Sequence, residues 1–171
     1  MMIEVPMQII TSTGVIKQLN LNKVLANTSI ANGGIKKLYR KIVDPYLRDT
    51  LPYIDYPVKV RFLVWLCTPT ADIDNTTPCS KYVLDSMQTA GVLINDNQKT
   101  IKEVDFVFMG RVKKRYNGDY GRCIMHVERS DAVGTEFAQF VKTHKPVLKD
   151  EFRAPKTKRK YNNKKTSRRK K

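Results

Sequence analysis

The feature that most constrains the fold is an unbroken alternation of apolar residues from Val58 to Leu66. Val58, Val60, Phe62, Val64 and Leu66 occupy every second position, and an extended strand places such residues on one face of a sheet. β-Branched and aromatic side chains also favour the strand conformation. The segment is therefore expected to form a strand with one face in a core, and the fold must contain a sheet around it.

Three further segments have the composition of strands. They are residues 3–10, 101–115 and 122–128. In the second of them, Val104, Phe106 and Phe108 form one apolar set with a period of two. Asn117-Gly118 is a strong signal for a tight turn, so the last two segments are expected to form a β-hairpin.

The first helical segment is expected to follow Gly33-Gly34, because residues 11–28 lack a period and look like a loop. Its apolar residues recur three and four positions apart and would share one helix face. They are Ile35, Leu38, Tyr39 and Ile42. Pro45 lacks the backbone donor that a helix interior needs and crowds the preceding turn, so we expect the helix to kink or end near Val43.

The second helical segment has clear signals at both ends. Thr77 is a candidate N-cap, Pro78 takes the favoured first position, and Gly91 follows the last turn. Its apolar stripe consists of Val83, Leu84 and Met87. Lys81 and Asp85 lie four positions apart, so they share a helix face and are expected to pair.

The chain is expected to form one folded domain followed by a basic tail. The strands and helices predict an α/β (α+β) domain with a central mixed β-sheet flanked by two or three helices, and 171 residues suffice for one core. The formal net charge is +16, but eleven of the 32 Lys and Arg residues lie in residues 153–171, where no acidic residue occurs. We assign residues 1–150 to the domain and residues 151–171 to a disordered tail.

A cytoplasmic protein without a membrane segment is expected. No apolar run approaches membrane-spanning length, and the first residues lack the charged start and apolar stretch of a signal peptide. Cys67, Cys79 and Cys123 are an odd number, which favours free thiols over a disulfide framework. Their spacing also matches no paired C-x-x-C zinc motif.

Three aspartates after the Val58–Leu66 strand are candidate metal ligands. Asp72 and Asp74 are two apart, so an extended segment would point both side chains to one face. Asp96 follows the second helix, and a chain that folds back would bring it alongside them. Such hard oxygen ligands suit Mg²⁺ or Mn²⁺, which also bind water and substrate phosphate. The alternative is that these aspartates are solvated turn residues.

The segment from Asp72 to Asp96 resembles the RusA-like Holliday junction resolvases, metal-dependent endonucleases that cut four-way DNA junctions. The resemblance consists of Asp72-Ile73-Asp74-Asn75, then Lys81, Asp85, Met87 and Gly91 at helical intervals, then Val92-Leu93-Ile94-Asn95-Asp96 as a closing strand. An early segment, Leu19-Asn20-Leu21-Asn22-Lys23, is similar to the family's asparagine-bearing loop. Residues 76–80 are extra relative to the family pattern, and Asn95 stands where the family has an acid.

The resemblance implies a RusA-like endonuclease domain that resolves Holliday junctions and other branched DNA by paired nicks in recombination and repair. It implies Mg²⁺ as cofactor, with Mn²⁺ as a possible substitute, and a homodimer as the acting form. Asp72, Asp74 and Asp96 would be the metal ligands and catalytic residues. Lys81 would act near the scissile phosphate, although a solvated helix lysine is an equal alternative. Asn22, Lys23 and Asn75 would contact DNA.

Two basic clusters are further candidates for DNA binding. The first is Lys113, Lys114 and Arg115 near the expected hairpin tip, and the second, in the tail, includes Lys158, Arg159 and Lys160. Neutralising phosphates releases condensed counterions and gives affinity without sequence choice. Both clusters could instead only improve solubility. The alternative to an enzyme is a non-catalytic, basic nucleic-acid-binding protein, such as a ribosome-associated one.

Overall fold

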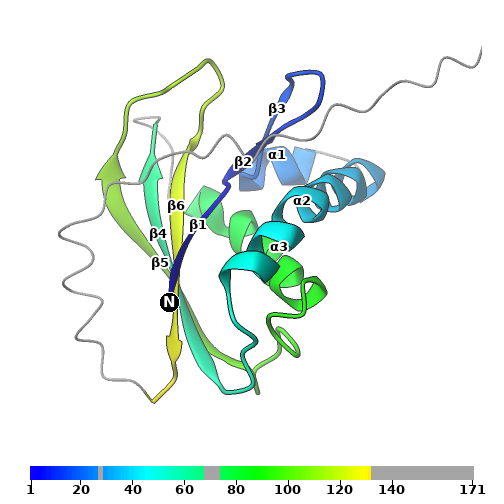
Figure 1. Ribbon diagram of the computed structural model, residues 1–171. Coiled ribbons are helices and arrows are strands. Elements are labelled where there is room, and N and C mark those ends of the chain that lie inside the picture. The colour runs from blue at the N-terminus through cyan, green and yellow to red at the C-terminus, as the bar shows by residue number, and fades with distance from the viewer. Residues whose placement is uncertain (27–28, 68–73, 132–171) are drawn as a thin grey trace, which may run out of the picture.

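Figure 1 shows the computed structural model, which describes residues 1–26, 29–67 and 74–131. A four-stranded mixed sheet forms one layer, and the two longer helices lie on one side of it. In chain order the elements are β1 (Met2–Val5), β2 (Gln8–Ile10), β3 (Ile16–Gln18), α1 (Leu21–Ala26), α2 (Ser29–Thr50), β4 (Val58–Leu66), the 3₁₀ helix η1 (Asp74–Thr76), α3 (Thr77–Thr89), β5 (Ile101–Arg111) and β6 (Gly121–Arg129). The expected mixed α+β class with a central mixed sheet is confirmed.

The strand from Val58 to Leu66 forms as expected and lies inside the sheet. The strand order is β1-β6-β4-β5, with β4 antiparallel to β6 and parallel to β5. Its alternating apolar residues are all buried beneath the helices, and Phe62 stacks on Phe106 of β5 with ring centroids 5.1 Å apart. On the opposite face, Leu63, Trp65 and Ile124 form a second, smaller buried cluster. The carboxyl-terminal half of β4 is thus buried on both faces, whereas Lys59 and Arg61 in its first half are partly exposed.

The expected hairpin between the last two strands is wrong, because β4 lies between β5 and β6. Residues 112–120 instead cross the carboxyl end of β4. There the Val112 amide donates to the Leu66 carbonyl at 3.1 Å, and the Cys67 amide donates to the Tyr120 carbonyl at 3.0 Å. Asn117-Gly118 does turn the chain, with Gly118 at φ +86°. A turn fixes only local direction, whereas burial of the most apolar strand decides which strands become neighbours.

The expectations for the amino-terminal part also need correction. Residues 3–10 form two strands, because β1 ends before Pro6 and β2 pairs with β3 in a separate two-stranded sheet. Residues 11–28 are not all loop, since β3 and α1 lie within them. Elements of three and six residues are too short to produce a recognisable period in the sequence.

Helix α2 is longer at both ends than expected. It begins before Gly33-Gly34 and continues through Pro45 to Thr50. Its buried face, which includes Tyr39, Val43 and Leu47, compensates for these breaks. Glycine in a helix interior costs only about 1 kcal/mol and proline about 3 kcal/mol, and burying one large apolar side chain returns about 1.5–3 kcal/mol.

The second expected helix agrees with α3, and Gly91 at φ +75° follows its C-cap Ala90. The N-cap is Thr76, one residue before the expected Thr77. The closing strand expected at residues 92–96 does not form, and only Leu93 makes a single bridge, to Ile54. The amides of Val92 and Leu93 donate to the Met87 carbonyl at 2.9 and 3.2 Å, so they cap α3 instead of pairing in the sheet.

Other expectations concern membranes, cysteines and the tail. In the described part of the chain, no helix is both long and apolar enough to cross a membrane. Cys67, Cys79 and Cys123 are free. The boundary expected at residues 150 and 151, together with the basic tail, lies outside the described residues.

Candidate active site and nucleic-acid interface

Several of the expected site residues lie wholly or partly outside the described structure. Asp72 falls in residues 68–73, and the tail cluster Lys158, Arg159 and Lys160 falls in residues 132–171. For Asp74 and Lys23 the structure gives the element but not the side chain, since Asp74 begins η1 and Lys23 lies in α1. The site is therefore built from the residues around α3.

Lys81 and Asp96 meet although 15 positions separate them in the sequence. Lys81 lies in the amino-terminal half of α3, and Asp96 follows the turn that Gly91 makes after the helix. The Lys81 Nζ atom is 3.4 Å from Asp96 Oδ2 and 3.0 Å from Asp85 Oδ1. The structure thus brings together two of the expected catalytic residues, and the expected Lys81–Asp85 pair forms.

Asp85 joins two helices through its two carboxylate oxygens. Only 5% of the residue is exposed, and its Oδ2 atom lies 2.5 Å from Nζ of Lys36 on α2. The sequence contains no specific signal for Lys36, which is one of several cations on the polar side of its helix. The packing of α2 on α3 selects it, because Asp85 is buried at that interface.

The charges of this cluster stabilise one another. Burial alone would raise the pKa of Asp85, but the bonds from Lys36 and Lys81 outweigh it and hold the pKa below its ordinary value. The hydrogen bond to Asp85 raises the pKa of Lys81, although partial burial opposes it, and Asp96 contributes further. Lys81 is therefore charged at neutral pH and, with 67% of its side chain exposed, can reach an incoming anion.

A pocket of about 240 Å³ opens between α2 and α3 beside these residues. It is lined by Asn32, Gly33, Lys36, Pro78, Lys81, Tyr82 and Asp85. Its wall is almost entirely apolar, because the aliphatic stems of lysines can line an apolar surface while their ammonium groups stay in water.

The expected metal ligands are only partly described. Among the residues with described side chains, no three His, Cys, Asp or Glu residues come close enough to hold a metal ion. Asp96 has 27% of its side chain exposed at the edge of the cluster, so it is open to a ligand. Its carboxylate, with those of Asp72 and Asp74, would be a donor set of oxygens alone, which suits Mg²⁺ or Mn²⁺.

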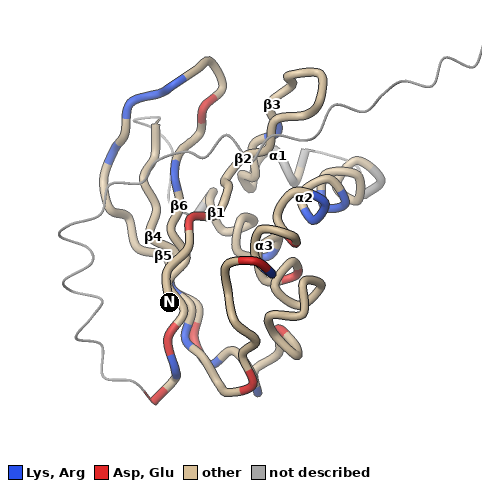
Figure 2. Tube along the Cα trace, viewed as in Figure 1, with Lys and Arg blue, Asp and Glu red and all other residues tan. Residues whose placement is uncertain are grey.

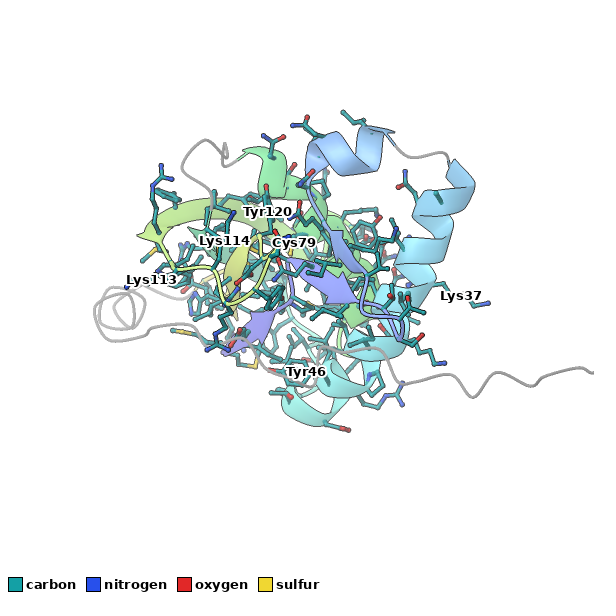
Figure 3. All side chains as sticks on the ribbon, turned by 90° about the horizontal axis from the view of Figure 1, so that it is seen from above. Lys37, Tyr46, Cys79, Lys113, Lys114 and Tyr120 are labelled. Atoms are coloured by element: carbon teal, nitrogen blue, oxygen red, sulfur yellow. The ribbon has the colours of Figure 1, made fainter. Side chains whose placement is uncertain are left out.

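The basic cluster Lys113, Lys114 and Arg115 lies in the connection that crosses β4, and all three residues are exposed. Figure 2 shows this run of positive charge at the top of the sheet, separate from the positive side of α2. Figure 3 places Lys113 and Lys37 on opposite sides of the molecule. Positive charge therefore lies on two sides of the molecule, one on α2 and one on the connection formed by residues 112–120.

A buried polar network fixes the connection from below. Arg122 donates two hydrogen bonds to Asp119, at 2.6 and 2.8 Å, and Gln8 donates a third at 2.7 Å. The Arg115 amide donates to Asp119 Oδ2 at 2.9 Å, the oxygen that also accepts one of the two Arg122 bonds. Burial would raise the pKa of Asp119, but these donors lower it. The sequence contains no signal for this network, since Gln8 is more than 100 positions away from its partner Asp119.

The expected asparagine contacts are near the start of α3. Asn22 is exposed on α1, and Asn75 is partly buried in η1. Helix α1 contacts both η1 and α3. Asn22 therefore lies in a helix rather than in the loop expected for it, and that helix adjoins the segment containing Asp74.

The described part of the site can neutralise and orient an anion. Lys81 offers an ammonium group beside the partly exposed carboxylate of Asp96, and Lys36 offers a second ammonium group at the same pocket. Fixed cations of this kind stabilise charge that develops on a transferring phosphoryl group. A comparison with protein-family models finds no matching family, and a comparison with curated protein sequences finds no matching protein.

Proposed function

We propose that this protein is an Mg²⁺-dependent, structure-selective endodeoxyribonuclease that nicks Holliday junctions and other branched DNA. We propose further that its fold is RusA-like and that it acts as a homodimer, which would suit two symmetric nicks. The observation that carries the proposal is the meeting of Lys81 with Asp96 at 3.4 Å. The resemblance to the resolvases assigns a role in catalysis to both residues. They lie 15 positions apart in the sequence, so helix periodicity does not account for their contact.

The residues have distinct roles in this proposal. Asp72, Asp74 and Asp96 would hold Mg²⁺, which when bound activates water and stabilises charge on the leaving oxygen. Lys81, kept protonated by its carboxylate neighbours, would orient the scissile phosphate and stabilise its growing charge. Asp85 would hold Lys81 in place through the 3.0 Å bond.

The exposed basic residues support binding to a polyanion. Lys113, Lys114 and Arg115 lie on a connection whose backbone is anchored to Asp119. Contacts between such basic side chains and phosphates position the DNA backbone without selecting a base sequence. Asn22 and Asn75 would add contacts on the side of α3.

A nicking assay on a synthetic four-way junction tests the proposal. We expect wild-type protein to nick the junction with Mg²⁺, and Asp74→Asn to abolish nicking while junction binding is unchanged or stronger, because the change removes charge and keeps shape. Asp72→Asn and Asp96→Asn should behave alike. Asp131→Asn, which alters an exposed aspartate after β6, is the matched control and should nick normally.

Two outcomes would contradict the proposal. If the three ligand variants nick at the wild-type rate in saturating Mg²⁺, the metal ligands are wrong. If wild-type protein binds junctions but never nicks them with Mg²⁺ or Mn²⁺, a non-catalytic nucleic-acid-binding function takes its place, which the exposed basic connection also favours.

A further inference from the structure

The pocket between α2 and α3 has walls and a rim of different chemistry. Pro78 and the ring of Tyr82 contribute to an almost wholly apolar wall. Lys36 and Lys81 also line the pocket, and both of their ammonium groups bind Asp85. A ligand that fits must therefore carry a flat or apolar body next to an anion.

The rim offers hydrogen-bond donors to an anion. Asp85 and Asp96 balance the charges of Lys36 and Lys81, so an anion would be held by free ammonium donors rather than by excess positive charge. Each ammonium group has three donors, and the salt bridges use one of Lys36 and two of Lys81, to Asp85 and Asp96. Donors thus remain for a phosphodiester oxygen. Burial, followed by the nearby Asp85 charge, raises the pKa of Tyr82, so its phenol stays neutral and does not repel that anion.

We propose that this pocket binds one unpaired nucleobase of DNA, with the adjoining phosphate held by Lys36 and Lys81. The proposal rests on the proposed function in taking DNA as the ligand, and it adds a subsite that reads unpaired structure. A volume of about 240 Å³ lies below the range of about 300–1,000 Å³ typical of pockets for larger ligands, which suits one base. Because Lys81 also contacts Asp96, the held phosphate lies at the candidate active site.

This subsite would distinguish DNA forms. In a duplex the bases are stacked and paired, whereas branch points and single strands offer bases that can leave the stack at low cost. Tyr82 is only 7% exposed and its ring packs against that of Tyr39, with centroids 5.6 Å apart, so a base would gain affinity from apolar contact with the pocket wall. Burial of about 55 Å² of apolar surface corresponds to about tenfold in affinity. The pocket therefore favours branched or single-stranded DNA over duplex.

Two adjacent glycines of α2 provide a matched pair of variants. Gly33 lines the pocket, and Gly34 does not. Both are exposed, and a Cβ atom added at either one meets no atom within 4 Å. Leucine at either position raises helix propensity equally. Gly33→Leu would thus fill the pocket, and Gly34→Leu would change the same helix without filling it.

The experiment measures equilibrium binding of a short single strand and of the blunt duplex of the same sequence by fluorescence anisotropy. We expect Gly33→Leu to weaken single-strand binding about tenfold and to leave duplex binding unchanged. Gly34→Leu should match wild type on both. The proposal is overturned if Gly33→Leu binds the single strand like wild type, or if both variants lose affinity equally.

A second measurement on the wild-type protein does not depend on the folding of any variant. Titration with deoxyadenosine monophosphate should shift the NMR signals of the Gly33 amide and the Tyr82 ring, and inorganic phosphate should bind more weakly because it has no ring. Equal binding of the two anions, or shifts confined to the basic connection, would refute a base site.

The two proposals fail separately. If wild-type protein does not nick junctions but Gly33→Leu selectively loses single-strand binding, the subsite stands and the nuclease proposal falls. If wild-type protein nicks junctions while Gly33→Leu binds all DNA normally, the nuclease proposal stands and the subsite falls.

Discussion

Replacing Asp85 by Asn isolates the charge of the carboxylate that joins α2 to α3. The side chain keeps its shape and one acceptor, but both lysines lose an anionic partner. A hydrogen bond to a charged group contributes about 1.5–3 kcal/mol. Lys36 and Lys81 have 39% and 67% of their side chains exposed, so water replaces much of what they lose. We therefore expect Asp85→Asn to lower the free energy of unfolding by about 1–2 kcal/mol at pH 7.

The pH dependence of that loss identifies its origin. The pKa of Asp85 is lower in the folded protein than its ordinary value, because the two lysine bonds outweigh the effect of burial. Its charge thus stabilises the fold fully above the ordinary aspartate pKa of about 4, and this contribution disappears as the pH falls through the lower folded value. The difference between wild type and Asp85→Asn should shrink between pH 7 and about pH 3.

Urea unfolding of both proteins at the two pH values measures this difference. Asp49→Asn, which alters an exposed aspartate near the end of α2, is the control and should change stability by less than about 0.5 kcal/mol. An equal loss for Asp85→Asn at both pH values would show that packing, rather than charge, carries the effect. Nicking should remain substantial in Asp85→Asn, since Asp96 still lies 3.4 Å from Lys81.

Three further predictions concern charge elsewhere. Lys81→Ala should lose single-turnover nicking while its junction affinity changes little, because Lys36 still holds the bound phosphate and the Lys81 ammonium group acts mainly as the transition state forms. An unchanged rate would favour a solvated lysine. Asp119→Asn should cost about 3–5 kcal/mol in urea unfolding, since it leaves Arg122 buried without its anion; a loss as small as that of the exposed control Asp131→Asn would contradict this. Removing residues 155–171 should weaken binding to junction, duplex and single strand by similar factors and make the salt dependence shallower; a loss confined to junctions would contradict a purely electrostatic tail.

Local features of the fold could be predicted from the sequence because their causes are local. The alternation of residues in β4 depends only on which face of the strand is buried. Likewise, Lys81 and Asp85 meet because four positions are slightly more than one helix turn, which places both on the same face. Gly91 takes a positive φ that ends α3. Each of these features involves a few neighbouring positions.

Features that depend on distant segments could not be predicted. The sequence does not reveal that β4 separates β5 from β6, since a turn such as Asn117-Gly118 is compatible with both arrangements. Lys36 enters the site only because α2 packs against α3. The helix itself continues past Pro45 because its buried face outweighs a local penalty, and that balance is visible only in the packed core. The hydrogen bond from Gln8 to Asp119 could not be predicted either, because the fold brings the two residues together from positions far apart in the sequence.

The position of β6 in the sheet has a consequence for how the chain acquires its structure during synthesis. Met2 pairs with His126 and Val5 with Cys123. One edge of β4 also pairs with β6, so it stays unpaired until β6 has been synthesised. Strand β1 can therefore pair in the sheet only after β6, close to the end of the described residues, has left the ribosome. Pairings so distant in sequence are slow to form, and unpaired strand edges are prone to aggregate in the meantime. Nascent chains that stop before residue 121 should accordingly remain protease-sensitive, whereas chains that extend past residue 129 should become resistant.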